Sequence, residues 1–89
     1  MDIEWDEQKR ERTLAERAVD FADVEHLEWP LALTREDSRN NYGERRFVTL
    51  GPIHGRLCVL VWCERNGAMR IISLRKANQR ERRAYDRGI

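Results

Sequence analysis

Hydrophobic residues follow two different spacings in the two halves of this 89-residue chain. Up to Pro30, apolar residues are sparse and recur at intervals of three or four, which is typical of helices. From Leu31 onward they alternate with polar residues, and β-branched residues become common, which is typical of strands. The pattern predicts an α+β fold in which a helical segment precedes an antiparallel sheet.

The helical segment is predicted to begin with a short strand, Ile3-Glu4-Trp5, followed by a polar helix over Glu7–Arg17. Asp6 is placed to cap this helix, because its carboxylate can accept hydrogen bonds from the free amides of the first turn. The apolar residues of the helix form only a narrow stripe, consisting of Leu14, Ala15 and Ala18. We therefore expect the helix to lie on the surface with much of its circumference in water.

A second short helix is predicted after Asp20, which is also a capping residue. Phe21, Val24 and Leu27 recur in it at three-residue spacing. Pro30 is expected to end this helix at Trp29, because the residue before a proline is disfavoured in the helical conformation.

Four strands are predicted after the helices, at residues 31–37, 45–51, 56–64 and 69–75. Gly51–Gly55 is a tight connection, and Asn66-Gly67 favours a type I′ hairpin, so consecutive strands should be antiparallel. The segment Leu57–Cys63 is apolar at each position, which indicates a central strand covered on both faces. Residues 37–45 are rich in turn formers and are expected to form the one long loop.

The chain is predicted to end in a helix from Gln79 to about Arg87. Asn78 and Glu81 have the spacing of a capping box, in which each side chain accepts from the other residue's backbone amide. The full prediction is a short strand and two helices, a four-stranded antiparallel sheet and a C-terminal helix, within a single domain over residues 1–89.

The two cysteines argue against a disulfide-stabilised protein. Cys58 and Cys63 lie on one predicted strand, so their Cα atoms should be about 16–17 Å apart, too far for an intrachain bridge. They also lie on opposite faces of that strand, and no other cysteine or histidine cluster accompanies them, so no metal site or cofactor is predicted. Without an apolar leader or a run of membrane length, we expect a cytoplasmic protein that contacts no membrane.

Acidic and basic residues are segregated along the chain, although its net charge is only +1. Residues 1–44 carry 13 acids and 6 bases, whereas residues 45–89 carry 3 acids and 11 bases. Most of the cations are arginines, whose planar guanidinium binds phosphate in a bidentate manner. The pattern favours an anionic partner, with mutual pairing of the two halves as the alternative.

Arginines within the predicted strands are the strongest candidates for a functional site. Arg46 and Arg75 lie beside the apolar centre, where an arginine is unusual unless it faces a cleft or a partner. On the last helix, Glu81, Arg82 and Tyr85 share one face. A guanidinium, a carboxylate and a phenol can together bind a phosphodiester and move protons during its cleavage. The alternative is that Glu81 only caps and pairs while Tyr85 packs onto the sheet.

Other residues offer weaker chemistry. His26 lies in the acidic helical segment and His54 in the turn after Pro52, and isolated surface histidines are commonly only solvated. A glycine-rich phosphate loop, a nucleophile elbow and paired carboxylates at motif spacing are all absent from the sequence. An ordinary metalloenzyme or hydrolase is therefore disfavoured.

The order and spacing of several short motifs resemble the BrnT family of type II toxin–antitoxin systems. The resemblance runs from about Ile3 to Tyr85. Its parts are Glu4-Trp5-Asp6-Glu7 with Lys9, then Leu14, Phe21, Tyr42-Gly43-Glu44-Arg45-Arg46-Phe47 leading to Gly51, Gly55-Arg56-Leu57, Arg70-Ile71-Ile72-Ser73-Leu74-Arg75-Lys76-Ala77, Glu81-Arg82-Arg83 and Tyr85. The sequence departs from the family at Thr13–Ala18, where the family often has Asn-Leu-x-Lys-His-Gly.

The resemblance implies a RelE-like fold and a metal-independent endoribonuclease that cleaves mRNA and arrests translation. It also implies a cognate BrnA-type ribbon-helix-helix antitoxin, expected in a 2:2 complex, through which alone the protein would contact operator DNA. Arg46 and Arg75 match basic positions linked to toxicity, and Glu81, Arg82 and Tyr85 are secondary catalytic candidates. The expected RNA-binding residues are Arg45, Arg56, Arg70, Lys76 and Arg83.

Two other functions remain compatible with the sequence: a non-catalytic nucleic-acid-binding module, and a small subunit that docks on an acidic protein. Modules that bind single strands usually display several stacking aromatics. The basic half has only Phe47, Trp62 and Tyr85, and Phe47 and Trp62 are expected in the core. This scarcity favours catalysis or partner docking over simple binding.

Overall fold

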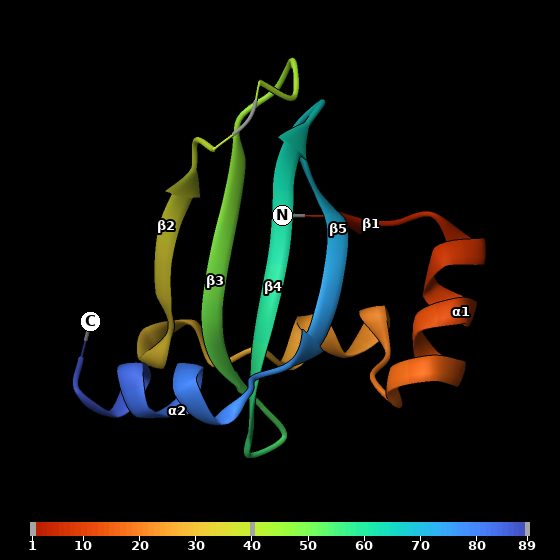
Figure 1. Ribbon diagram of the computed structural model, residues 1–89. Coiled ribbons are helices and arrows are strands. Elements are labelled where there is room, and N and C mark those ends of the chain that lie inside the picture. The colour runs from red at the N-terminus through yellow and green to blue at the C-terminus, as the bar shows by residue number, and fades with distance from the viewer. Residues whose placement is uncertain (1, 40, 89) are drawn as a thin grey trace.

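The computed structural model describes residues 2–39 and 41–88, and it has an α+β fold built on one five-stranded sheet (Figure 1). The strand order is β1-β5-β4-β3-β2. The strands are β1 (Ile3–Glu4), β2 (Leu33–Asp37), β3 (Arg46–Ile53), β4 (Arg56–Arg65) and β5 (Ala68–Lys76). The helices are α1 (Glu7–Arg17), α2 (Gln79–Asp86) and two 3₁₀ helices, η1 (Phe21–His26) and η2 (Trp29–Leu31).

The predicted α+β class is confirmed, but the predicted count of four strands in a purely antiparallel sheet is wrong. Strand β1 is a fifth strand, which pairs in parallel with β5 through Ile3 opposite Met69 and Glu4 opposite Arg70. A two-residue strand carries no periodicity, and its partner lies in the other half of the chain. The sequence pattern therefore indicates a short strand at this position without indicating where it pairs.

The three antiparallel pairs β2·β3, β3·β4 and β4·β5 follow the prediction. Both tight connections are two-residue turns with positive φ at each position: His54 and Gly55 between β3 and β4, and Asn66 and Gly67 between β4 and β5. This is the type I′ pattern. The loop predicted over residues 37–45 lies between β2 and β3, and Asn40 within it lies outside the described residues.

The second helix is shorter and tighter than predicted. It is the 3₁₀ helix η1, which ends at His26, and Pro30 belongs to the separate turn η2 instead of following the helix end. The three-residue spacing of Phe21, Val24 and Leu27 explains η1, because side chains at i and i+3 align in a 3₁₀ helix. Since η2 occupies Trp29–Leu31, strand β2 begins at Leu33 and not at Leu31.

The hydrophobic core lies on one face of the sheet. Residues from η1 and from the segment after it pack there against alternate residues of the central strands, including Leu60, Ile71 and Leu74. Trp62 packs against this core. The Phe47 ring stacks on the Trp62 ring, with the two ring centroids 4.8 Å apart. The opposite face is covered in part by α2, which lies across one end of the sheet (Figure 1). Strand β4 is thus buried on both sides, as predicted.

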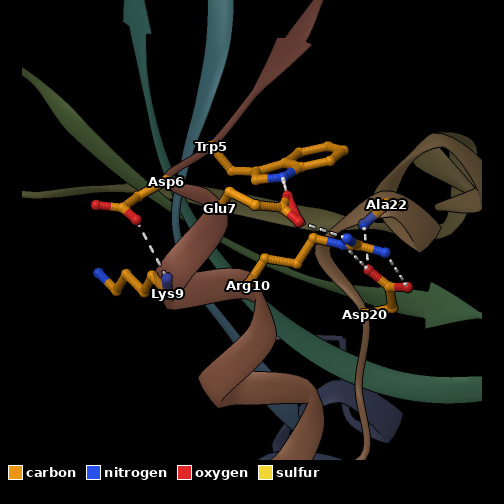
Figure 2. Close-up of polar contacts among 7 residues, drawn as sticks. All are labelled: Trp5, Asp6, Glu7, Lys9, Arg10, Asp20 and Ala22. Atoms are coloured by element: carbon orange, nitrogen blue, oxygen red, sulfur yellow. Dashed lines mark hydrogen bonds and ion pairs between the residues drawn. The ribbon is translucent and has the colours of Figure 1, made fainter.

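Helix α1 lies beside the sheet edge formed by β1 and β5, and none of its residues is buried (Figure 1). Asp6 caps it as predicted, accepting from the Lys9 amide at 3.2 Å. Its expected apolar stripe stays outside the core, since Leu14 remains 44% exposed. The helix is held instead by Arg10, which donates to Asp20 at 2.7 and 3.0 Å and to Glu7 at 2.8 Å (Figure 2).

The capping box that opens α2 is present with both hydrogen bonds, so this prediction is confirmed. The helix ends at Asp86, one residue before the predicted Arg87. Among the helices in the described ranges, none combines the length and hydrophobicity needed to span a lipid bilayer.

Candidate ribonuclease site

The strand register places Arg46 and Arg70 on either side of Cys63, on the sheet face opposite the core. Arg46 of β3 pairs with Cys63 of β4, and Cys63 pairs with Arg70 of β5. The Cα atoms of the two arginines are therefore two strand spacings apart, about 9–10 Å. Cys63 lies between the two arginines and is fully buried.

The Arg46 guanidinium is held above an aromatic ring. Its central carbon lies 3.9 Å from the centroid of the Tyr42 ring, and its Nη2 lies 3.7 Å from a carboxylate oxygen of Glu44. The buried Nε atom of Arg46 is the one side-chain polar atom in the described ranges that is both buried and without a hydrogen-bond partner. A buried donor left unsatisfied is costly.

Lys9 of α1 adds a third cation to this face. Burial lowers the pKa of Lys9 most, and the positive charges of Arg46, Arg12 and Arg70 lower it further, against an opposing contribution from Asp6. The charges of both strand arginines thus act on Lys9, and Figure 2 shows its side chain on the opposite side of α1 from Arg10. Lys9, Arg46 and Arg70 are together called the sheet cluster below.

The sequence pattern does not single out Lys9 as a candidate site residue, and it places Arg70 only among the expected RNA-binding residues. Lys9 comes from a polar helix in the acidic half, and it reaches this face because β1 pairs with β5 just before α1 begins. Arg70 is also held near β1, with Nη1 3.6 Å from a carboxylate oxygen of Glu4. The unexpected parallel pairing is thus what assembles the sheet cluster.

Arg75 lies on the same sheet face as Arg46 but outside the sheet cluster. It pairs with Val59, four residues along β4 from Cys63, so its Cα lies about 16 Å from that of Arg46. Its guanidinium donates to both carboxylate oxygens of Glu81, at 2.8 and 2.7 Å. This ion pair raises the pKa of Arg75 and lowers the pKa of Glu81.

Glu81 and Tyr85 make structural contacts. Glu81 accepts from the Asn78 amide in the capping box as well as from Arg75. The Tyr85 hydroxyl donates to the backbone carbonyl of Leu31, which fastens α2 to η2. These contacts agree with the structural alternative to a catalytic role, in which Glu81 caps the helix and pairs with an arginine while Tyr85 packs against the rest of the domain. A catalytic role for either residue stays a prediction.

The remaining candidates lie apart from the sheet cluster. Arg56, Arg82 and Arg83 line a cavity of about 560 Å³ between α2 and the β3–β4 turn. Lys76 is exposed at the end of β5. Arg45 lies next to Arg46 but pairs with Glu36 at 2.9 Å and contacts the Phe47 ring, on the other side of the sheet. Two separate basic surfaces result, one at Arg46 and Arg70 and the other at Arg56, Arg82 and Arg83, and the remaining predicted cations lie outside both.

A family model described as the ribonuclease toxin, BrnT, of type II toxin–antitoxin systems matches residues 5–81. This chain belongs to the BrnT family. A comparison with curated proteins gave no match. The matched range contains the whole sheet cluster, together with Arg75 and Glu81. The chain is thus a ribonuclease toxin of a type II system, a class in which a protein antitoxin is the partner.

For a BrnT ribonuclease, the sheet cluster is a candidate for binding the negatively charged transition state of RNA cleavage. Its arginines lie on a partly buried surface, where cations interact with a phosphate more strongly than in open water. Glu4 lies 3.6 Å from Arg70, and Glu44 lies 3.7 Å from Arg46 while it binds Arg65 more closely, at 2.9 Å. The second basic surface, at Arg56, Arg82 and Arg83, extends the area over which an RNA backbone can bind.

Proposed function

We propose that this BrnT chain is an endoribonuclease that cleaves mRNA without a divalent metal ion, and that the scissile phosphodiester binds at the sheet cluster. The observation that carries the proposal is the placement of Arg46 and Arg70 on either side of Cys63. The positive charges of both arginines also lower the pKa of Lys9. Three cations on one small surface supply the positive charge that a metal ion provides in many other nucleases.

The proposed reaction is an internal transfer within the RNA. The 2′-oxygen attacks the adjacent phosphorus while the bond from phosphorus to the 5′-oxygen of the next nucleotide breaks. The proton of the 2′-hydroxyl leaves, the departing 5′-oxygen takes up a proton, and the products carry a 2′,3′-cyclic phosphate and a 5′-hydroxyl. Arg46 and Arg70 stabilise the additional charge on the phosphorane oxygens through charge-assisted hydrogen bonds.

We further propose that a BrnA-type ribbon-helix-helix antitoxin neutralises the toxin by covering the sheet cluster. An acidic or apolar segment of the antitoxin would compete with RNA for the same cations. Ribbon-helix-helix proteins act as dimers, so a 2:2 complex is the simplest assembly, with the DNA-binding face of the antitoxin left free to bind the operator. Inhibition of translation follows from the loss of intact mRNA.

The direct test is incubation of the purified chain with a single-stranded RNA in excess chelator. We expect cleavage with 2′,3′-cyclic phosphate ends, and binding without cleavage for the deoxyribonucleotide of the same sequence, since DNA lacks the attacking hydroxyl. Activity that disappears in chelator and returns with magnesium would overturn the metal-independent mechanism. RNA that is bound but never cut would instead support the non-catalytic binding module.

A further inference from the structure

The two histidines of the chain, which the sequence suggests are isolated, meet in the fold. His26 ends η1, and His54 is the first residue of the β3–β4 turn. Their ring centroids are 4.8 Å apart, with the planes inclined at 41°. Asp23, one turn before His26, completes a group whose ligand atoms all lie within 4.8 Å of one another.

The backbone at His54 is unusual for a histidine. Its φ of 50° lies in the left-handed region, and the equivalent position of the other hairpin is Asn66 with a φ of 55°. Asparagine followed by glycine is the preferred pair for such turns, because asparagine tolerates this conformation best among residues with a side chain. The β3–β4 turn therefore carries a less favoured residue than the β4–β5 turn. That choice places the His54 imidazole against His26.

We propose that Asp23, His26 and His54 bind one divalent transition-metal ion, for which Zn²⁺ is the natural probe. Two imidazole nitrogens and a carboxylate oxygen are a ligand set that Zn²⁺ prefers. Ligands at a tetrahedral zinc ion lie about 3.4 Å apart. The three side chains reach that spacing by small rotations, because both imidazoles are exposed and Asp23 is half-buried.

The site lies far from the sheet cluster. His54 precedes the first residue of β4, and Cys63 lies near the other end of that strand, about 23 Å away at the usual rise per residue. Asp23 and His26 belong to η1, which covers the opposite sheet face from Arg46 and Arg70. The bound ion would therefore tie η1 to the β3–β4 turn and stabilise the domain, while taking no part in RNA cleavage.

Each imidazole also lies near a carboxylate. His26 Nε2 is 3.2 Å from Glu25 Oε1, and His54 Nε2 is 3.6 Å from Asp23 Oδ1. Since the carboxylate next to His54 belongs to the same group, a cation bound there would meet a negative charge as well as two imidazole nitrogens.

The test uses the full chain without an affinity tag, stripped with chelator and then titrated with Zn²⁺ by calorimetry. Thermal unfolding is recorded with and without the ion. We expect one ion per chain and a metal-dependent rise in the unfolding temperature. His54→Asn should weaken binding about tenfold or more. It should also keep the fold, because asparagine suits the turn, and it should leave RNA cleavage unchanged.

A matched control is the double variant His54→Asn with Asn66→His. It has the composition of the natural chain and, like the natural chain, one asparagine–glycine turn and one histidine–glycine turn, but its histidines no longer meet. It should bind no better than His54→Asn alone. If the natural chain shows no binding or no thermal shift, or if the double variant binds as tightly as the natural chain, the proposed site is wrong. Neither result bears on cleavage at the sheet cluster, which is measured separately.

Discussion

Arg75 and Glu81 form a closed bidentate ion pair, with both guanidinium-to-carboxylate distances below 3 Å. The pair joins strand β5 to helix α2, and the same carboxylate completes the helix cap. A guanidinium held in this way must release its partner before it can bind a phosphate. Arg46 is held less tightly by its carboxylate, since its Nη2 lies 3.7 Å from Glu44 and its Nε has no hydrogen-bond partner among the described residues.

The Arg75–Glu81 pair should be visible as a coupling in unfolding free energy. Glu81→Gln keeps an oxygen for the helix cap but removes the charge, and Arg75→Ala removes the guanidinium. In a double-mutant cycle we expect a coupling of about 1 kcal/mol or less, because the Arg75 side chain is 39% exposed. Denaturant unfolding measures it. RNA cleavage should fall less in Arg75→Ala than in Arg46→Ala, and an equal or larger loss would place Arg75 at the phosphate.

Arginines of the sheet cluster should control toxicity. We expect induced expression of the chain to arrest bacterial growth, and Arg46→Ala or Arg70→Ala to relieve the arrest. Each loses a charge-assisted contact worth about 1.5–3 kcal/mol, which corresponds to roughly ten- to hundredfold in cleavage. Arg45→Ala is the matched control, since that neighbour pairs with Glu36 on the other side of the sheet. Soluble cluster variants that remain as toxic as the Arg45 variant would refute the site.

Lys9 should weaken the fold while it strengthens RNA binding. Burial and neighbouring cations lower its pKa, so the charged form is less favourable in the folded state than in the unfolded chain. At neutral pH we therefore expect Lys9→Gln to raise the unfolding temperature and to reduce affinity for a non-cleavable deoxyribonucleotide. The slope of log affinity against log salt concentration should become less steep by the amount expected for about one phosphate contact. Arg17→Gln, at the far end of the same helix, should leave the affinity unchanged.

Asp37 should make the stability of the chain depend on pH in the acid range. Hydrogen bonds from Arg39 and, more weakly, from Tyr42 lower the pKa of this buried carboxyl from its usual 3.8 to about 2. Its contribution is present in full above the unfolded-state pKa and is lost as the pH falls through the folded-state pKa. Asp37→Asn should therefore be less stable than the natural chain at pH 7, and the difference should shrink between about pH 4 and pH 2. A difference that stays constant over this range in thermal unfolding would contradict the assignment.

The antitoxin should associate faster at low ionic strength. A cationic surface attracts an acidic segment electrostatically, and added salt screens this attraction. The association rate should therefore fall as the salt concentration rises. Stopped-flow mixing at two salt concentrations measures the rate, and light scattering measures the stoichiometry. Arg46→Ala should associate more slowly than Arg45→Ala. A pair that still cleaves RNA at saturating antitoxin would show that inhibitor and substrate use different surfaces.

Local signals in the sequence predicted most of the helices and strands. The caps at Asp6 and Asn78 and the turn at Asn66-Gly67 each depend on neighbouring residues, and each is present in the structure. The pattern of η1 was visible as a three-residue spacing, although its 3₁₀ geometry was not distinguished from an α-helix.

Long-range relations in the site were not predictable in the same way. Arg46 is a candidate because an arginine in a strand beside the core is unusual, but the arginine opposite it across β4 is Arg70 and not Arg75. That relation depends on the register of three strands. The roles of Lys9, and of the two histidines that meet, depend on pairings between segments far apart in the chain. A single sequence contains no direct record of such contacts.

The parallel pairing of β1 with β5 also bears on the order in which the chain is made. Ile3 is synthesised before its partner Met69, which follows only after the three intervening strands. Contacts between such distant segments form late and slowly in folding. A chain whose synthesis stops before β5 therefore lacks both Arg70 and the strand with which β1 pairs. The proposed RNA-binding surface is complete only once β5 has been made.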